Sequence, residues 1–206
     1  MTKSTVIVDY GMGNIFSNCK ALERLGDNWL VSSSPQVICG ARRLILPGVG
    51  HFGKAMRTLQ ANGLVDALHE AVLIKRIPVL GICLGMQLMA SFSEEGKANG
   101  LNWFEESVIR FRVQNRDVYK VPHVGWNTII NQKTSRLLHG LSPDEVYYFV
   151  HSYHFDNEKA AEVVGTTQYE YAFVSVVERE NIYGVQFHPE KSHQAGSHIL
   201  KNFLRE

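Results

Sequence analysis

The sequence predicts an α/β protein with one open, mainly parallel sheet covered by helices. In the first half, short apolar runs alternate with amphipathic stretches, as expected when each strand is followed by a crossover helix. In the second half, β-branched and aromatic runs follow one another with fewer helical gaps, which predicts added antiparallel strands. The chain has 206 residues and no linker or internal repeat, which indicates a single domain over residues 1–206.

The first half is expected to contain strand–helix units. The strands are the buried apolar runs TVIVD (5–9), RLILP (43–47) and IPVLG (77–81). A helix from about Ile15 to Leu25, ended by Gly26, follows the first strand. Two later helices each have one apolar face, and a third helix follows Cys83. The first face is formed by Phe52, Met56 and Leu59, and the second by Leu64, Leu68, Ala71 and Val72.

Four runs of the second half are expected to be strands, and the chain is expected to end in a helix. The strands are SVIRFRV (107–113), VYYFV (146–150), AFVSVV (172–177) and IYGVQF (182–187). The final stretch SHILKNFLRE (197–206) has a helical period that places Ile199, Leu200 and Phe203 inward. Ligands of open α/β sheets bind at the carboxyl ends of the strands, so the glycine-rich stretches that follow the first three strands are candidate sites.

Composition excludes several classes of protein. The formal net charge of +1 argues against a nucleic-acid or acidic-membrane partner. The three cysteines form neither a disulfide framework nor a C-x-x-C metal motif, and Cys19 and Cys39 are interpreted as structural thiols. The longest apolar runs are far shorter than a membrane span. The simplest expectation is a cytoplasmic protein with no metal and no cofactor.

The stretch VLGICLGMQLM (79–89) contains the candidate nucleophile. It places Cys83 between Gly81 and Gly85, at the end of a predicted strand and the start of a predicted helix. Small residues surround a nucleophile elbow because the strained turn brings backbone segments close together. The start of a helix favours an anion and so activates a thiol. A buried structural cysteine in a tight turn would give the same motif.

The stretch GVQFHPE (184–190) supplies a candidate proton shuttle, which a thiolate that forms acyl intermediates needs. His188 ends a β-type run, and Glu190 follows closely enough to hold its tautomer and stabilise the imidazolium. The alternative is a strand that ends in a proline turn with a solvated acid. Backbone N–H groups of Leu84 and of PGVG (47–50) are candidate donors to an oxyanion.

Two other motifs point to different chemistry. GVGHFG (48–53) is a literal dinucleotide-binding G-x-G-x-x-G, but the nearest acid, Asp66, lies inside a helical stripe rather than at a strand end. The stretch HSYH places His151 and His154 three residues apart without an acidic or cysteine ligand at a matching spacing. Neither a nicotinamide cofactor nor a metal is therefore expected.

Six stretches spread over the chain resemble the class I, triad-type glutamine amidotransferases, and most closely the glutaminase subunits of imidazole glycerol phosphate synthase. They are DYGMGN (9–14), LPGVG (46–50), GICLGMQL (81–88), PHVGWN (122–127), YFVHSY (148–153) and GVQFHPEKS (184–192). The resemblance implies a flavodoxin-like sheet and hydrolysis of L-glutamine. It also implies a heterodimer with a (β/α)8-barrel cyclase, which uses the ammonia to make imidazole glycerol phosphate and aminoimidazole carboxamide ribonucleotide in histidine biosynthesis.

The resemblance also implies a role for individual residues. Cys83 would be the nucleophile, His188 the general acid/base and Glu190 its orienter. The other implied roles are an oxyanion hole formed by Gly48, Val49 and Leu84, a glutamine site formed by Gln87, Glu95, Ser152 and Tyr153, and a partner interface formed by Asn14, Trp126, Tyr148 and Lys191.

Three other functions fit parts of the sequence. EKSHQAG (190–196) and RENIYGVQF (179–187) resemble paralogues that feed ammonia to a sugar amidotransferase in surface-polysaccharide biosynthesis. A stand-alone cysteine peptidase or γ-glutamyl hydrolase would share the cysteine turn and the histidine but is not expected to contain PHVGWN or YFVHSY. A catalytically silent flavodoxin-like binding module would not need the Cys–His–Glu set.

Overall fold

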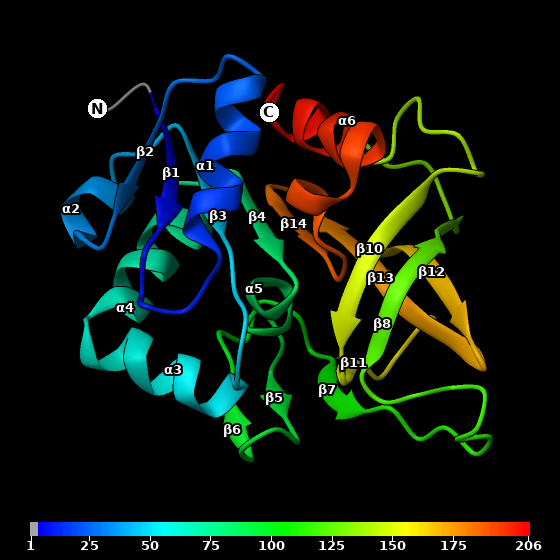
Figure 1. Cartoon of the computed structure of the whole chain (residues 1–206). Helices are drawn as coiled ribbons and strands as arrows, with labels where there is room; N and C mark the ends of the chain where they lie inside the picture. Colours follow the sequence, from blue (N-terminus) through cyan, green and yellow to red (C-terminus); the bar gives the residue numbers. More distant parts are fainter. Residues whose placement is uncertain (1–3) are drawn as a thin grey trace.

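The computed structural model describes residues 4–206, which fold around an eight-stranded mixed sheet (Figure 1). Its strand order is β2-β1-β3-β4-β14-β13-β12-β9. The strands are β1 (Thr5–Val8), β2 (Trp29–Ser32), β3 (Arg43–Leu46), β4 (Val79–Ile82), β9 (Ile130–Asn131), β12 (Val163–Tyr169), β13 (Tyr171–Arg179) and β14 (Ile182–Val185). Neighbours from β2 to β14 are parallel, and neighbours from β14 to β9 are antiparallel. The carboxyl ends of β3, β4 and β14 therefore meet at one edge.

Helices cover both faces of the parallel part of the sheet. They are α1 (Ile15–Arg24), α2 (Pro35–Ile38), α3 (Phe52–Ala61), α4 (Leu64–His69), the π-helical turn η1 (Glu70–Ile74), α5 (Leu84–Gln87), the 3₁₀ turn η2 (Pro189–Lys191) and α6 (His193–Phe203). On one face, Ile7 of β1 shares a core cluster with Leu22 of α1 and Ile199 of α6. On the other face, Val6 shares a cluster with Leu59 of α3. This alternation follows from the two-residue period of a strand.

Two smaller sheets carry the rest of the second half. One pairs β8 (His123–Thr128) with β10 (Val146–His151), and the other has the order β11-β7-β5-β6, formed by β5 (Phe92–Ser93), β6 (Ala98–Asn99), β7 (Ser107–Arg110) and β11 (Tyr153–Phe155). Figure 1 shows the β8–β10 pair in front of β12 and β13. No helix within residues 4–206 is long and apolar enough to cross a membrane.

The predicted fold class is confirmed, with one difference in strand direction. The IYGVQF run was expected to add an antiparallel strand, but β14 is antiparallel only to β13 and parallel to β4. The reason is geometric. β13 runs against the parallel strands, and a short turn after Arg179 reverses the chain, so β14 must run with them. The C-terminal helix is confirmed, with Ile199, Leu200 and Phe203 buried.

The turn after β4 packs directly against the end of β3 at Gly85. A Cβ atom at Gly85 would lie 1.7 Å from the carbonyl oxygen of Leu46. Only glycine allows this approach, because a backbone carbonyl in a buried strand cannot rotate away. The predicted need for a small residue after Cys83 thus has a definite cause, the contact between α5 and β3.

The substitution Gly85→Ala should therefore lower the free energy of unfolding by about 3 kcal/mol or more, measured by urea denaturation. The matched control is Gly53→Ala in α3, where the nearest atoms lie 3.4 Å from the added Cβ. This control should change the stability by less than about 1 kcal/mol. A Gly85→Ala protein as stable as the wild type would contradict the packing described here.

Candidate active site

Cys83 lies at the carboxyl end of β4 in a conformation that few residues with a side chain adopt. Its φ is 53° and its ψ is −108°, which stores strain on the order of 1–3 kcal/mol. Its N–H donates to the carbonyl of Val185 at 2.8 Å and so ties the turn to the end of β14. The helix expected after Cys83 is only the single turn α5, so a helix dipole contributes little to its activation.

His188 and Glu190 form a buried pair beside this turn. The Nδ1 atom of His188 lies 2.8 Å from Oε1 of Glu190, and both side chains are almost fully buried. Burial disfavours the imidazolium, but the negative charges of Cys83 and Glu190 outweigh burial and raise the pKa of His188. The other ring nitrogen, Nε2, is buried without a hydrogen-bond partner. The pair can therefore hold a proton at Nδ1 and offer Nε2 for proton transfer.

Three hydrogen bonds fasten the backbone of His188 to β10. The His188 N–H donates to the carbonyl of Tyr148 at 2.9 Å. The Tyr148 N–H donates to Oγ of Ser192 at 2.9 Å, and the Ser192 hydroxyl donates to the carbonyl of His188 at 2.7 Å. From the other side, Gly196 of α6 approaches so closely that a Cβ there would lie 1.9 Å from the carbonyl oxygen of Pro189. The segment that carries His188 is thus fixed on two sides.

A cavity of about 330 Å³ opens onto Cys83. All four residues expected to bind glutamine line it, together with two of the three expected to form the oxyanion hole; the lining residues are Val49, Gly50, Cys83, Leu84, Gln87, Glu95, Pro122, Val150, His151, Ser152 and Tyr153. Oε2 of Glu95 accepts a hydrogen bond from the N–H of Phe52 at 2.7 Å, which fixes its carboxylate at the start of α3. The volume suits a small polar ligand rather than a peptide chain.

The expected oxyanion donors come from two segments that touch. Gly48 lies so close to Leu84 that a Cβ at Gly48 would be 2.8 Å from the Leu84 Cβ. Within residues 4–206, the N–H of Val49 donates to no protein acceptor. The loop is held from below by Tyr10, whose hydroxyl donates to the carbonyl of Pro47 at 2.8 Å. Tyr10 was not among the residues expected at the site.

Gln186 is a second residue that the sequence motifs did not single out. Its Nε2 atom lies 3.6 Å from the sulfur of Cys83, and its Oε1 accepts a hydrogen bond from Nε2 of Gln87 at 3.0 Å. Nε2 of Gln87 also donates to the carbonyl of Tyr153 at 2.9 Å. The sequence signal that could have identified Gln186 is a polar amide between two apolar residues, Val185 and Phe187, at the end of a predicted strand. Both neighbours are buried.

Three of the four residues expected at a partner interface form one cluster. Trp126 and Tyr148 are direct neighbours across β8 and β10, and Trp126 stacks on His193 with ring centroids 5.1 Å apart. Nζ of Lys191 lies 5.5 Å from the ring centroid of Tyr148. Trp126 is 47% exposed. Asn14 caps α1, which packs against the turn that carries Lys191.

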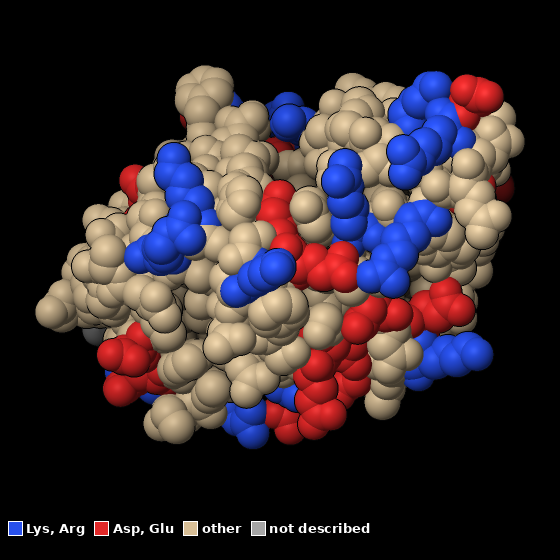
Figure 2. Space-filling model, turned by 90° about the horizontal axis from the view of Figure 1, so that it is seen from below, with Lys and Arg blue, Asp and Glu red and all other residues tan. Residues whose placement is uncertain are grey.

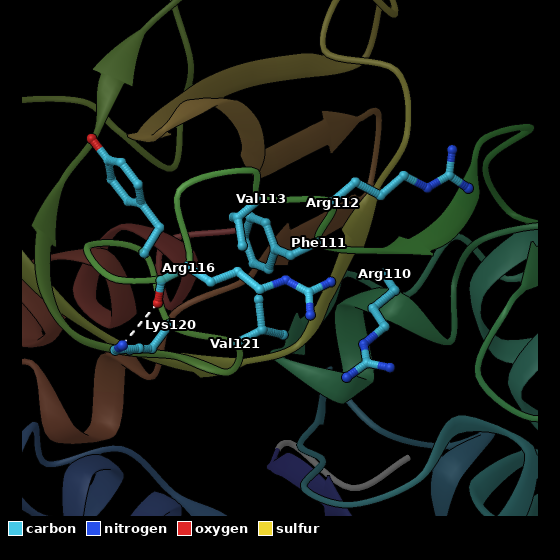
Figure 3. Close-up of a pocket in the computed structure, with 8 residues that line it drawn as sticks. Arg110, Phe111, Arg112, Val113, Arg116, Lys120 and Val121 are labelled. Atoms are coloured by element: carbon cyan, nitrogen blue, oxygen red, sulfur yellow. Dashed lines mark hydrogen bonds between the residues drawn. The ribbon is translucent and has the colours of Figure 1, made fainter.

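A larger cavity of about 620 Å³ lies beside the first and is basic rather than catalytic (Figure 3). Its lining residues are Arg110, Phe111, Arg112, Val113, Arg116, Tyr119, Lys120 and Val121. In Figure 3, Arg112 points away from the other two arginines, and it pairs with Glu94 at 2.7 Å. Figure 2, seen from below, shows lysines and arginines on both halves of the surface, with the larger group on the right beside acidic side chains. No cysteine, histidine or carboxylate lines this cavity.

The HSYH motif gains no support from the structure as a metal site. His151 and His154 bond to different groups, since His151 contacts His123 and the carbonyl of Tyr153, whereas His154 contacts the carbonyl of Phe155 and a tyrosine hydroxyl. Among the described residues, no cluster of three or more His, Cys, Asp or Glu could hold a metal. Cys19 and Cys39 are free, half-buried thiols, as expected for structural cysteines.

Comparison with known proteins identifies the family of this chain. The family model "Glutamine amidotransferase class-I" matches residues 6–206. The chain is 41% identical over 200 residues to "Imidazole glycerol phosphate synthase subunit HisH 2" of Methanococcus maripaludis (97% of this chain, 98% of the relative), and 40% identical over 201 residues to subunit HisH 1 of the same organism (96% and 97%). It is 44% identical over 199 residues to HisH 2 of Pseudomonas aeruginosa (97% and 98%).

Solved structures are similar in fold. A crystal structure of a glutamine amidotransferase matches with a TM-score of 0.73 at 19% identity, covering 97% of both chains. PurLQS from Thermotoga maritima matches with a TM-score of 0.72 at 14% identity, covering 100% of this chain and 99% of the other. With a matching family model over nearly the whole chain and relatives above 40% identity, the chain belongs to the class I glutamine amidotransferase family.

Proposed function

We propose that the chain is the glutaminase subunit of an imidazole glycerol phosphate synthase. It hydrolyses L-glutamine to glutamate and ammonia and passes the ammonia to a cyclase subunit. The observation that carries the proposal is the strained Cys83 turn, which opens onto a small cavity beside the buried His188–Glu190 pair. The relatives named HisH support the histidine pathway as the destination of the ammonia.

The proposed reaction has two halves. The Cys83 thiolate attacks the side-chain carboxamide carbon, and the carbonyl oxygen becomes an oxyanion beside the N–H groups of Val49 and Leu84. His188 gives its proton to the departing ammonia, which leaves a γ-glutamyl thioester. His188 then takes a proton from water, which attacks the thioester and releases glutamate and the Cys83 thiolate. Glu190 holds the imidazole in the tautomer that both transfers need.

The cavity offers the groups that the glutamine head group requires. Glu95 supplies a carboxylate for the α-ammonium group, and its position is fixed at the start of α3. The side-chain NH₂ of Gln87 donates to the carbonyl of Tyr153 and to Gln186, which leaves its oxygen for the substrate. Ser152 and Tyr153 line the same cavity from the loop between β10 and β11. These contacts favour a free amino acid over a peptide.

The partner proposed here is a (β/α)8-barrel cyclase bound as a heterodimer. The cluster of exposed Trp126 with half-buried Tyr148 and Lys191, with Asn14 nearby, offers aromatic side chains of the kind enriched at interfaces. A paralogue that feeds a sugar amidotransferase would share the same glutaminase site. Reconstitution with a cyclase therefore tests the acceptor, whereas glutamine hydrolysis tests the site.

Cys83→Ala should abolish glutamine-dependent formation of imidazole glycerol phosphate by the reconstituted complex, with a loss of roughly 10³-fold or more. Ammonia-dependent formation should remain, because the cyclase does not need the thiol when ammonia is supplied. Cys19→Ala and Cys39→Ala serve as controls and should keep both activities. Normal glutamine turnover by Cys83→Ala would refute the site assignment. Failure of the wild-type complex with glutamine but not with ammonia would refute the proposed acceptor pairing.

His188→Asn should reduce glutamine turnover by roughly 10⁴-fold, since nucleophile and proton shuttle act as one unit. Glu190→Gln should have a smaller effect, on the order of 10²-fold, because Glu190 orients the imidazole and transfers no proton. Steady-state kinetics of the complex measure both losses, and mass spectrometry of the intact protein reports any accumulated thioester. An undiminished His188→Asn protein would shift the search for the base to His151.

Trp126→Ala should weaken cyclase binding by roughly 30-fold, because a half-exposed tryptophan on a paired strand is a typical interface hot spot. Isothermal titration calorimetry of the two subunits measures the change. Val118→Ala, which removes another exposed apolar side chain away from the cluster, is the control and should bind normally. Equal affinities for the wild type and Trp126→Ala would place the interface elsewhere.

A further inference from the structure

The sulfur of Cys83 has a buried neighbour that the reaction above does not use. The side-chain amide of Gln186 approaches to 3.6 Å from Sγ, and Gln186 is fully buried. A buried amide needs hydrogen-bond partners, and loss of one costs about 1–3 kcal/mol. Gln186 has two such partners, Gln87 on one side and the sulfur on the other.

The hydrogen-bond network fixes which end of the amide faces the sulfur. The carbonyl of Tyr153 can only accept a hydrogen bond, so the group of Gln87 that contacts it must be the NH₂. The same NH₂ group contacts Gln186, so the atom of Gln186 on that side must be the oxygen. The NH₂ group of Gln186 therefore points at the sulfur of Cys83. The carbonyl of Tyr153 thus fixes the orientation of the Gln87 amide, and the Gln87 amide fixes that of Gln186 toward Cys83.

A donor in this position distinguishes the two protonation states of the sulfur. The thiol can donate weakly to the carbonyl of Val150, which lies 3.9 Å away. The thiolate is a far better acceptor for the NH₂ group of Gln186, because hydrogen bonds to charged groups are stronger than those between neutral groups. The amide therefore favours the charged, nucleophilic form.

The other groups that face the sulfur do not replace this donor. His188 supplies a positive charge, with Glu190 behind it. Tyr10 directs its hydroxyl to the carbonyl of Pro47, and burial together with the charge of Cys83 raises the pKa of Tyr10. His151 donates to the carbonyl of Tyr153 and is kept neutral by burial, which lowers its pKa. Gln186 is the neutral donor that contacts the sulfur directly.

We propose that Gln186 is a further catalytic residue, which donates a hydrogen bond to the Cys83 thiolate and is oriented for this by Gln87. The proposal rests on Cys83 as the nucleophile of the function proposed above. Gln87 then has two tasks, because it lines the glutamine cavity and also fixes the amide that contacts the sulfur. The substrate cavity and the nucleophile are linked through one chain of hydrogen bonds.

The test measures the rate of Cys83 alkylation by iodoacetamide against pH, with the labelled residue identified by mass spectrometry. Gln186→Met keeps the length of the side chain and removes the donor. The pH midpoint of alkylation should move up by about one unit, and the rate at pH values below the wild-type midpoint should fall about tenfold. The rate well above the midpoint should stay near that of the wild type. Cys19 and Cys39 in the same molecule provide internal references.

A second variant keeps the test decisive if Gln186→Met does not fold. Gln87→Leu removes the group that orients Gln186 and should shift the midpoint in the same direction by a smaller amount. The matched control is Asn202→Leu, which removes a buried amide that donates to the carbonyls of Leu137 and His139 and contacts no site residue. It should lower the melting temperature without moving the midpoint.

Each outcome bears on a separate claim. An unchanged midpoint in both Gln186→Met and Gln87→Leu, with a lowered melting temperature, would assign the amide a structural role and overturn the proposal. If the variants shift the midpoint but the wild type hydrolyses no glutamine with any partner, the hydrogen bond from Gln186 to the thiolate stands and the proposed function is refuted.

Discussion

The hydrogen bond from the N–H of Cys83 to the carbonyl of Val185 joins the two halves of the site. It closes the parallel pairing of β4 with β14 at the point where β4 turns into α5. Because the pairing is parallel, both strands end at the same edge, and the residues that follow them face one another. The sulfur of Cys83 and the imidazole of His188 meet for this reason, although they lie about half the chain apart. Gly85 also helps to position the sulfur, because its lack of a side chain lets the turn after β4 pack against β3.

Local sequence patterns predicted much of the fold but not the pairing that builds the site. The three apolar runs and the helices after them follow from burial and period alone. The direction of β14 depends on β13, which the pattern around residues 182–187 does not contain. β2 (Trp29–Ser32) and α2 (Pro35–Ile38) were missed because both are four residues long and largely half-buried. β12 and β8 were missed for another reason, since GTTQ and HVGWNT alternate too weakly to stand out.

Cys83, the four residues expected to bind glutamine and two of those expected in the oxyanion hole line one cavity. The supporting residues Tyr10 and Gln186 were not predicted. Their importance depends on contacts with distant segments, at Pro47 and at Gln87 and Cys83. The charge states of the histidines near Cys83 likewise depend on the fold. Burial lowers the pKa of His123 to about 4 and keeps that ring neutral, and His151 bonds to it at 3.2 Å. The cation beside the sulfur is therefore His188 rather than a diffuse group of histidines.

The closed set of hydrogen bonds between His188, Ser192 and Tyr148 constrains how such a subunit can change its partner over evolution. The surface strand β10 and the proton shuttle share backbone donors and acceptors, so neither can shift without the other. The exposed side chains of β10 and β8, such as Val124 and Trp126, are outside this set, whereas Tyr147 and Phe149 are buried in the core. Substitutions of these exposed side chains can therefore alter the recognition surface without moving the backbone that positions the imidazole.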